Sequence, residues 1–322
     1  MCCMVVCVGC ATTSVTSTEP GSLASAEAMF PTVDITINQN TLGKTVRKIG
    51  EEVGGGLVSV YGLEDRPTGV INLHGVTYEK MVTRLADVTK CSYQKRSYYY
   101  FLYPNEYALL LDYNLESLLP ERYSDMSTTI ALGTKTSLFN AFAMLSDSLG
   151  ITVIADNIVA DAVTGEITLE NAPVYAVIEA LLQSALIPPN DIELDATDEY
   201  IFVYARGNNH SDTLLLNKAQ LTPEQLAFLD KKINLTLPRP HGDEEAIPFY
   251  LDAFPLGDTL DSLASQIGLS ITIEKEIQRL PVNHVIMNDV RVETALNLVI
   301  RQWLVPRFGY ELYNDRIHIR FK

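Results

Sequence analysis

The residues whose side chains could do the most chemistry are four cysteines within the first ten positions of the chain: Cys2, Cys3, Cys7 and Cys10. A zinc site needs thiolate or imidazole ligands held in a fixed geometry, and no histidine or folded pattern lies beside these cysteines. A disulfide framework distributes its cysteines through the fold, whereas a single cysteine, Cys91, lies beyond this cluster. The remaining interpretation is a targeting segment, because an uncharged, largely apolar stretch precedes Cys10.

The residues around Cys10 resemble the lipoprotein box of bacterial exported proteins. Val8 and Gly9 are small residues before a cut, and the resemblance implies that Cys10 then receives lipid. Cys7 stands where that family prefers leucine, and no basic start is present, so an ordinary signal peptide is the alternative. We expect residues 1–10 to be the signal remnant, with Cys10 as the lipidation site.

The composition after this segment fits an exported, tethered protein. Residues 11–30 are mostly small and polar, which predicts a flexible tether. No later stretch approaches the roughly 20 apolar residues that span a bilayer. The net charge is −16, with 40 acidic against 24 basic residues. Nucleic acid is therefore not an expected partner, because phosphate binding needs clustered lysine and arginine.

No catalytic or metal-binding pattern stands out in the rest of the sequence. HExxH, GxSxG and Walker-type motifs are absent. Acidic stretches follow His210 and His241, but acidic loops are usually only solvated. We expect no metal, no cofactor and no enzymatic activity. The five histidines lie at positions that are not equivalent to one another: His74, His210, His241, His284 and His318.

The segment SYYYFLYP, residues 97–104, is the most unusual candidate binding surface. Tyrosines on a strand can stack on a sugar or form an edge that accepts a partner strand, although an ordinary strand is the alternative because tyrosine has high strand propensity. We predict that Tyr107–Asn114 covers this edge as a hairpin with Ser97–Tyr103. The candidate edge residues are Tyr98, Tyr99, Tyr100 and Tyr103.

An internal repeat dominates the remaining sequence. Segments that begin at Thr41, Ser137 and Pro255 share apolar residues at i, i+4, i+7 and i+11, followed by glycine. This spacing is one buried face of a helix closed by a left-handed cap. The capping glycines are Gly54, Gly150 and Gly268.

A second shared block follows about thirty residues later in each copy. Alternating apolar residues at Ile71 and Leu73 predict a half-buried strand, and the next apolar residues have helical spacing. Extended lead-in strands precede the first helices, with Phe249 and Leu251 as the lead-in of the third copy. Each copy ends in tyrosine-rich or β-branched strands. The predicted fold class is α+β, with three tandem small β-α-β-β-α-β domains.

These blocks resemble the secretin and TonB N-terminal short domain. The resemblance rests on the helix-glycine-strand block around Gly54, Gly150 and Gly268 and on the segment GVINLHGVTYEKMVTRL with its counterparts. We expect linkers between domains that unfold nearly independently. Thr222 and Pro223 predict the start of a short helix in the second linker. The expected boundaries are 31–122, 123–205 and 246–322 for the three domains and 206–245 for the linker with the short helix.

The resemblance implies a non-enzymatic envelope protein that acts through protein–protein contacts. We expect a periplasm-facing component of a secretin-like secretion or transport system, held at the outer membrane by a lipid anchor. Its expected partners are envelope proteins of secretin-like or TonB-type machinery, and further copies of itself. Two alternatives remain open: a periplasmic enzyme such as a cell-wall hydrolase that uses the repeats as a scaffold, and a TonB-type signal-transducing module.

Overall fold

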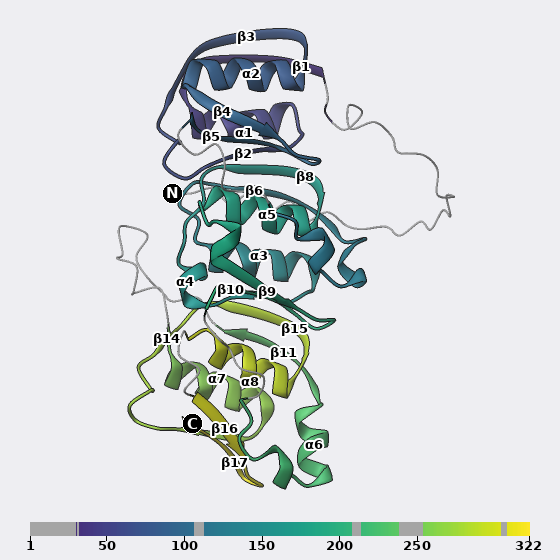
Figure 1. Cartoon of the computed structure of the whole chain (residues 1–322), viewed down its shortest axis with the longest axis vertical. Helices are drawn as coiled ribbons and strands as arrows, with labels where there is room; N and C mark the ends of the chain where they lie inside the picture. Colours follow the sequence, from purple (N-terminus) through teal and green to yellow (C-terminus); the bar gives the residue numbers. More distant parts are fainter. Residues whose placement is uncertain (1–29, 31, 106–112, 208–213, 238–253, 304–307) are drawn as a thin grey trace, which may run out of the picture.

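The protein is an α+β fold of three similar units in a single row (Figure 1). Helices and sheets alternate along the long axis of the row, from β1 and β3 at one end to β16 and β17 at the other. The computed structural model describes residues 30, 32–105, 113–207, 214–237, 254–303 and 308–322. The signal remnant, most of the tether and Cys10 lie outside this part of the chain.

The three units have the same order of elements, and each unit ends in two strands where the prediction left one or two. The first unit contains β1 (Thr32–Thr41), α1 (Leu42–Glu52), β2 (Leu57–Ser59), β3 (Pro67–Thr77), α2 (Tyr78–Thr89), β4 (Cys91–Lys95) and β5 (Tyr100–Pro104). The second contains β6 (Ser127–Leu132), α3 (Leu138–Leu149), β7 (Val153–Ala155), α4 (Asn157–Ala160), β8 (Ile167–Pro173), α5 (Val174–Ser184), β9 (Ile192–Ala196) and β10 (Ile201–Ala205).

The third unit has additional short elements. It contains β11 (Lys232–Leu237), β12 (Phe254–Pro255), α7 (Leu256–Ile267), β13 (Ser270–Ile273), β14 (Pro281–Val282), β15 (Val285–Arg291), α8 (Val292–Arg301), β16 (Phe308–Leu312) and β17 (Arg316–Phe321). The short helix α6 (Pro223–Leu229) precedes it. As predicted, Thr222 caps α6: its side chain accepts from the backbone N–H of Gln225, and the Gln225 side chain accepts from the Thr222 N–H.

The repeat register predicted from the apolar positions is confirmed. The first helices of the units start at Leu42, Leu138 and Leu256, and the second helices start at Tyr78, Val174 and Val292. Both series are therefore separated by 96 and then 118 residues. The three capping glycines all have positive φ, as the predicted left-handed caps require. The helix positions Leu85, Leu181 and Val299 are equivalent, and all three are buried.

The strand pairing is also common to the three units. The lead-in strand pairs antiparallel with the strand before the second helix, as β1–β3, β6–β8 and β11–β15. The final hairpin of each unit pairs parallel with the strand after the first helix, as in β2–β5. In the third unit the lead-in strand is β11, which lies inside the stretch that we expected to be a linker. Phe249 and Leu251 lie outside the described residues.

The first two units are not separate bodies joined by a linker, because they share a sheet and a core at their boundary, which we call the first junction. There β2 pairs antiparallel with β8, so that one five-stranded sheet runs through both units in the order β4-β5-β2-β8-β6. A single apolar core likewise contains side chains of both units, among them Leu57 and Leu181. The two units bury both faces of their shared sheet, because helices pack on each side of it.

The expected edge at Tyr98, Tyr99, Tyr100 and Tyr103 is also wrong. Strand β5 pairs with β4 on one side and with β2 on the other, so it has no open edge. Tyr99 and Tyr100 are each 1% exposed. The predicted hairpin with Tyr107–Asn114 therefore has no free strand to pair with, and residues 107–112 lie outside the described part of the chain.

Candidate functional site

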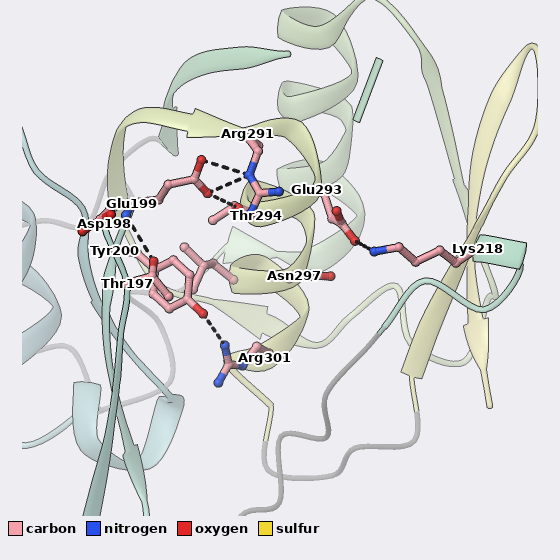
Figure 2. Close-up of a pocket in the computed structure, with 11 residues that line it drawn as sticks. Thr197, Asp198, Glu199, Tyr200, Lys218, Arg291, Glu293, Thr294, Asn297 and Arg301 are labelled. Carbon is pink, nitrogen blue, oxygen red and sulfur yellow. Dashed lines mark hydrogen bonds and ion pairs between the residues drawn. The ribbon is translucent and has the colours of Figure 1, made fainter. Parts of the chain in front are cut away.

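A polar pocket of about 500 Å³ lies where the second unit meets the third, which we call the second junction (Figure 2). Residues 197–200, which connect β9 to β10, line one side of the pocket. Helix α8 lines the opposite side, and Lys218, from the segment that joins the units, lies at one end. The pocket is therefore built by the packing of two units and not by either unit alone.

Glu199 connects the two units across this pocket. Its carboxylate accepts hydrogen bonds from Arg291 Nε at 3.0 and 3.1 Å and from the Thr294 hydroxyl at 2.5 Å (Figure 2). The hydrogen bond to Glu199 raises the pKa of the Arg291 guanidinium, whose Nη1 also lies 3.6 Å from Asp230. The Glu199 side chain is only 14% exposed, whereas the Arg291 side chain is 43% exposed, so the carboxylate is shielded from water and the guanidinium is partly solvated.

A second set of polar contacts surrounds Arg301 on the same helix. Its Nη1 lies 2.7 Å from Asp195 Oδ2 and donates to the Tyr200 hydroxyl at 3.3 Å. The guanidinium also lies over the Phe202 ring, 4.4 Å from its centroid. Burial, followed by the nearby Asp195 carboxylate, raises the pKa of Tyr200. Arg301 therefore ties the final hairpin of the second unit to the third unit.

The far end of the pocket is more open. Lys218 Nζ lies 3.3 Å from Glu293 Oε1, and more than half of the Lys218 side chain is exposed. Two buried polar atoms of α8 have no hydrogen-bond partner among the described residues, Asn297 Oδ1 and Arg301 Nε. Helix α8 thus leaves some polar capacity unused in the pocket.

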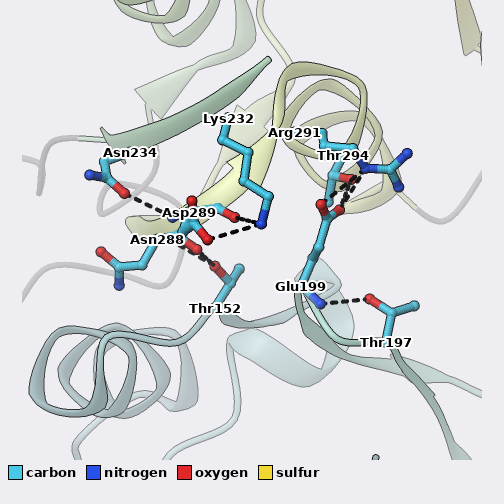
Figure 3. Close-up of polar contacts among 9 residues, drawn as sticks. All are labelled: Thr152, Thr197, Glu199, Lys232, Asn234, Asn288, Asp289, Arg291 and Thr294. Carbon is cyan, nitrogen blue, oxygen red and sulfur yellow. Dashed lines mark hydrogen bonds and ion pairs between the residues drawn. The ribbon is translucent and has the colours of Figure 1, made fainter. Parts of the chain in front are cut away.

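A third group of contacts lies beside the pocket, between the loop that follows α3 and strand β15 (Figure 3). The Thr152 hydroxyl accepts from the Asn288 backbone N–H at 2.9 Å. The Asn288 side chain donates to the carbonyls of Ser146 and Ile151, each at 3.0 Å. Lys232 Nζ lies 2.9 Å from Asp289 Oδ2 within the third unit. The second junction therefore combines these polar contacts with an apolar cluster that joins Ile154 and Phe202 of the second unit to the core of the third.

The arrangement supports positioning more readily than catalysis. The Glu199 carboxylate already accepts from two donors, the Arg291 Nε–H that its two oxygens share and the Thr294 hydroxyl, so it is poorly placed to take a proton from a substrate. The Thr294 hydroxyl donates to that same carboxylate and is buried. Each cation of the lining has a carboxylate within 4 Å. These groups fix the orientation of one unit on the next.

The tyrosines of the first unit occupy the corresponding place at the first junction. The Tyr99 hydroxyl donates to Gln183 Oε1 at 2.8 Å in a buried contact, and burial raises the Tyr99 pKa. Tyr98 packs edge-on against Tyr175 of α5. Tyr103 stacks on Phe101 within the first unit. Tyr98 and Tyr99 therefore join two units of the same chain.

Sequence reasoning missed the residues of the second junction. Glu199, Arg291 and Arg301 belong to no known motif and have ordinary surface character. The signal was in the repeat itself, because Arg291 and Arg301 occupy the positions of Pro173 and Gln183 in the preceding copy. A charged residue that replaces an apolar or neutral one at an equivalent position marks a junction of different chemistry.

The other candidate residues lie apart from this pocket. His74 Nδ1 lies 3.5 Å from Asp34 Oδ1 on an exposed surface. His284 contacts the Leu237 carbonyl, and His318 contacts the Thr272 hydroxyl at 2.9 Å. His210 and His241 are outside the described residues. The structure therefore brings none of the three described histidines to the pocket.

Within the described ranges, no group of three histidine, cysteine, aspartate or glutamate side chains is placed to hold a metal ion. No helix in those ranges is both long and apolar enough to cross a membrane. Comparisons of the chain with family models, curated proteins and solved structures found no match.

Proposed function

We propose that this chain is a non-enzymatic component of a bacterial cell envelope that acts through protein–protein contacts. It is anchored in the outer membrane by lipid on Cys10 and faces the periplasm, where it serves a secretin-like secretion or transport system. The observation that carries the proposal is the threefold repeat: three α+β units with helices in one register, arranged in a row. Such rows present long surfaces for partner proteins.

The chemistry of the second junction supports the same proposal. Its partly buried carboxylate and guanidinium groups are used to orient one unit on another. Glu199 and Arg301 hold two units at a fixed angle, which a spacer or ring-forming protein needs. The acidic surface, with a net charge of −16, keeps such a protein soluble beside the membrane.

The anchor is tested by metabolic labelling with a clickable palmitate analogue in a Gram-negative host. We expect label on the wild-type chain and on the Cys7→Ser variant, but none on Cys10→Ser. The Cys10→Ser protein should also leave the outer-membrane fraction. Equal labelling of the wild type and Cys10→Ser contradicts the anchor.

The role in an envelope machine is tested by chemical cross-linking in intact cells of the native host. We expect cross-linked peptides from envelope assembly proteins, with crosslinks that map to the exposed faces of the three units. A peptidoglycan-degradation assay with the purified chain tests the alternative of a cell-wall hydrolase. Turnover that a single substitution in the pocket abolishes, such as Glu199→Gln, contradicts a non-enzymatic role.

A further inference from the structure

The two ends of the row carry complementary parts of one sheet. At the first junction, three strands of the first unit and two strands of the second combine into the five-stranded sheet. The first unit begins with a two-stranded sheet, β1–β3, and the third unit ends with a three-stranded sheet, β13–β17–β16. The C-terminal end of one copy therefore has the strands that the N-terminal end of another copy lacks.

The open edges of these terminal sheets correspond to the strands that pair at the first junction. Strand β3 is the counterpart of β8, and β13 is the counterpart of β2, which pairs with β8. Among the described strands, β3 pairs with β1 alone and β13 with β17 alone. Unpaired strand edges are templates for another chain. Neither edge is blunted by lysine, and Pro67 at the start of β3 is the single proline on the two strands.

Burial distinguishes these edges from the internal strands. Each residue of β2 is buried, because helices cover both faces of the shared sheet. In β13, by contrast, exposed and half-buried residues alternate. Strand β3 is likewise exposed at most positions, including Val70 at 61%. The exposed strands β3 and β13 at the two ends of the row therefore correspond to buried strands of the first junction that lack a neighbouring unit.

A small residue on the first helix of each unit makes room for the next unit. At the first junction, a Cβ added to Gly50 would lie 2.5 Å from the Thr168 side chain of β8. The counterpart of Gly50 in the second unit is Ser146, which is fully buried at the second junction. The counterpart in the third unit is Ala264, which is small but half-exposed. The third unit thus keeps the vacant position that an incoming strand requires.

A polar residue at one strand position reaches the cap of the preceding helix at both internal junctions. Glu170 accepts from the Gly55 backbone N–H at 3.0 Å. Its counterpart Asn288 donates to the carbonyls of Ser146 and Ile151. The first unit carries His74 at this position, exposed on β3. An imidazole can donate to helix-end carbonyls, as Asn288 does.

We propose that copies of this chain associate head to tail, with β13 of one copy paired antiparallel to β3 of the next. The register of the first junction pairs Leu57 with Thr168 and Val58 with Ile167. The same offsets pair Ile271 with Asn72 and Thr272 with Ile71 between copies. The occupant of each end is a second copy of the chain. Such a heterologous contact builds an open filament, or a ring if the rotation closes.

Variants that each block one of the two contact surfaces test the proposal. Ala264→Arg places a large side chain on α7 where the incoming strand β3 must lie. Asn72→Arg places one on β3 where the helix of the other copy must lie. Both positions tolerate arginine in the monomer because they are solvent-accessible. The full chain is used with Cys10→Ser, so that the result does not depend on the proposed lipid anchor. Sedimentation velocity in reducing buffer is run over a concentration series, with added salt to screen the repulsion between acidic copies.

We expect the Cys10→Ser chain to form species larger than a dimer as its concentration rises. Ala264→Arg and Asn72→Arg should each remain monomeric, and their equimolar mixture should form a dimer and nothing larger, because each variant retains one working end. The dimer also shows that both variants fold. The matched controls Ser265→Arg and Thr32→Arg, exposed positions on the same helix and sheet, should assemble like the parent. A parent chain that stays monomeric overturns the proposal, and so does a mixture that stays monomeric.

Discussion

The two junctions of this chain bring equivalent elements together with different chemistry, and among the described strands only the first junction has strand pairing between units. At the first junction, a shared sheet and a shared apolar core join the units, and the Tyr99–Gln183 contact is fully buried. At the second junction, Tyr200 and Arg301 occupy the corresponding positions, and charged groups surround an open pocket. The comparison teaches that one repeat can produce either a single folded body or a docked neighbour, depending on a few side chains.

A buried segment occupies the space at the first junction that corresponds to the pocket of the second. At the first junction the Leu115 backbone N–H donates to Glu179 Oε1 at 2.8 Å, and Leu115 is buried beside it. The counterpart of Glu179 on α8 is Asn297, whose side-chain oxygen has no partner among the described residues. The segment that leaves the first unit thus fills the space that stays open at the second junction.

The largest expected effect comes from truncating the core shared by the first two units. Leu181→Ala should lower the free energy of unfolding by ~2–5 kcal/mol, because Leu181 is fully buried. Differential scanning calorimetry should show one shifted transition that contains the first and second units, with a smaller change in the third. The control Leu118→Ala removes an exposed side chain and should change stability by less than about 0.5 kcal/mol. A shift of the second unit alone would mean that the first junction does not couple its units.

A smaller effect is expected from the charge pair at the second junction. Glu199→Gln keeps the shape of the side chain but removes the charge that Arg291 and Thr294 face. Hydrogen bonds to a charged group contribute ~1.5–3 kcal/mol, and the partial exposure of Arg291 reduces the expected loss to about 1–2 kcal/mol. The loss should grow smaller in high salt. Asp198→Asn, at an exposed neighbouring carboxylate, is the matched control, and an equal effect of both variants would contradict the role of Glu199.

The tyrosine contact at the first junction should respond to loss of a single hydroxyl. Tyr99→Phe removes the buried hydrogen bond to Gln183 and should cost about 1 kcal/mol in urea unfolding. Because the contact is buried, this loss should not depend on salt, unlike that of Glu199→Gln. Tyr61→Phe, at an exposed tyrosine of the same unit, provides the baseline. A salt-dependent loss at Tyr99 would remove the distinction between the junctions.

The smallest expected effect is a pH dependence within the second unit. Burial, and next the nearby Asp156 carboxylate, raise the pKa of Asp161 to about 6 from its ordinary 3.8. The folded state therefore binds this proton more tightly than the unfolded state, and stability falls as pH rises from about 4 to about 6. Asp161 is only half-buried, so after solvent screening the fall should be about 1 kcal/mol or less. Asp161→Asn should flatten that part of the stability curve, and an unchanged slope would contradict it.

The helices could be predicted from the sequence because their signals are local. The spacing that starts at Leu42 and ends at Gly54, repeated twice, defines one buried helical face and its cap whatever lies around it. The capping box at Thr222 is local in the same sense. The repeat register then fixed which residues are equivalent.

The strand neighbours could not be predicted in the same way. A tyrosine-rich strand such as β5 has the same sequence signature at an edge and in the middle of a sheet. Its position depends on β2, which is distant in sequence, and the pairing of β2 with β8 depends on the second unit. The lead-in strand of the third unit was misplaced in the sequence for the same reason, because β11 is recognised as that strand only by its pairing with the distant β15. Pocket residues such as Glu199 acquire their roles only after two units pack.

Native-state hydrogen exchange in increasing urea tests the central distinction most directly. Amides of β2, β5 and β8 should reach one common unfolding free energy, because the first and second units open together through their shared sheet and core. Amides of β15 and α8 should follow a separate isotherm. The Glu199→Gln substitution should lower the urea concentration at which the β15 and α8 amides begin to exchange by unfolding, and it should leave that concentration unchanged for the β2 and β8 amides. Separate isotherms for β2 and β8, or one isotherm for the whole chain that Glu199→Gln shifts uniformly, would contradict the account.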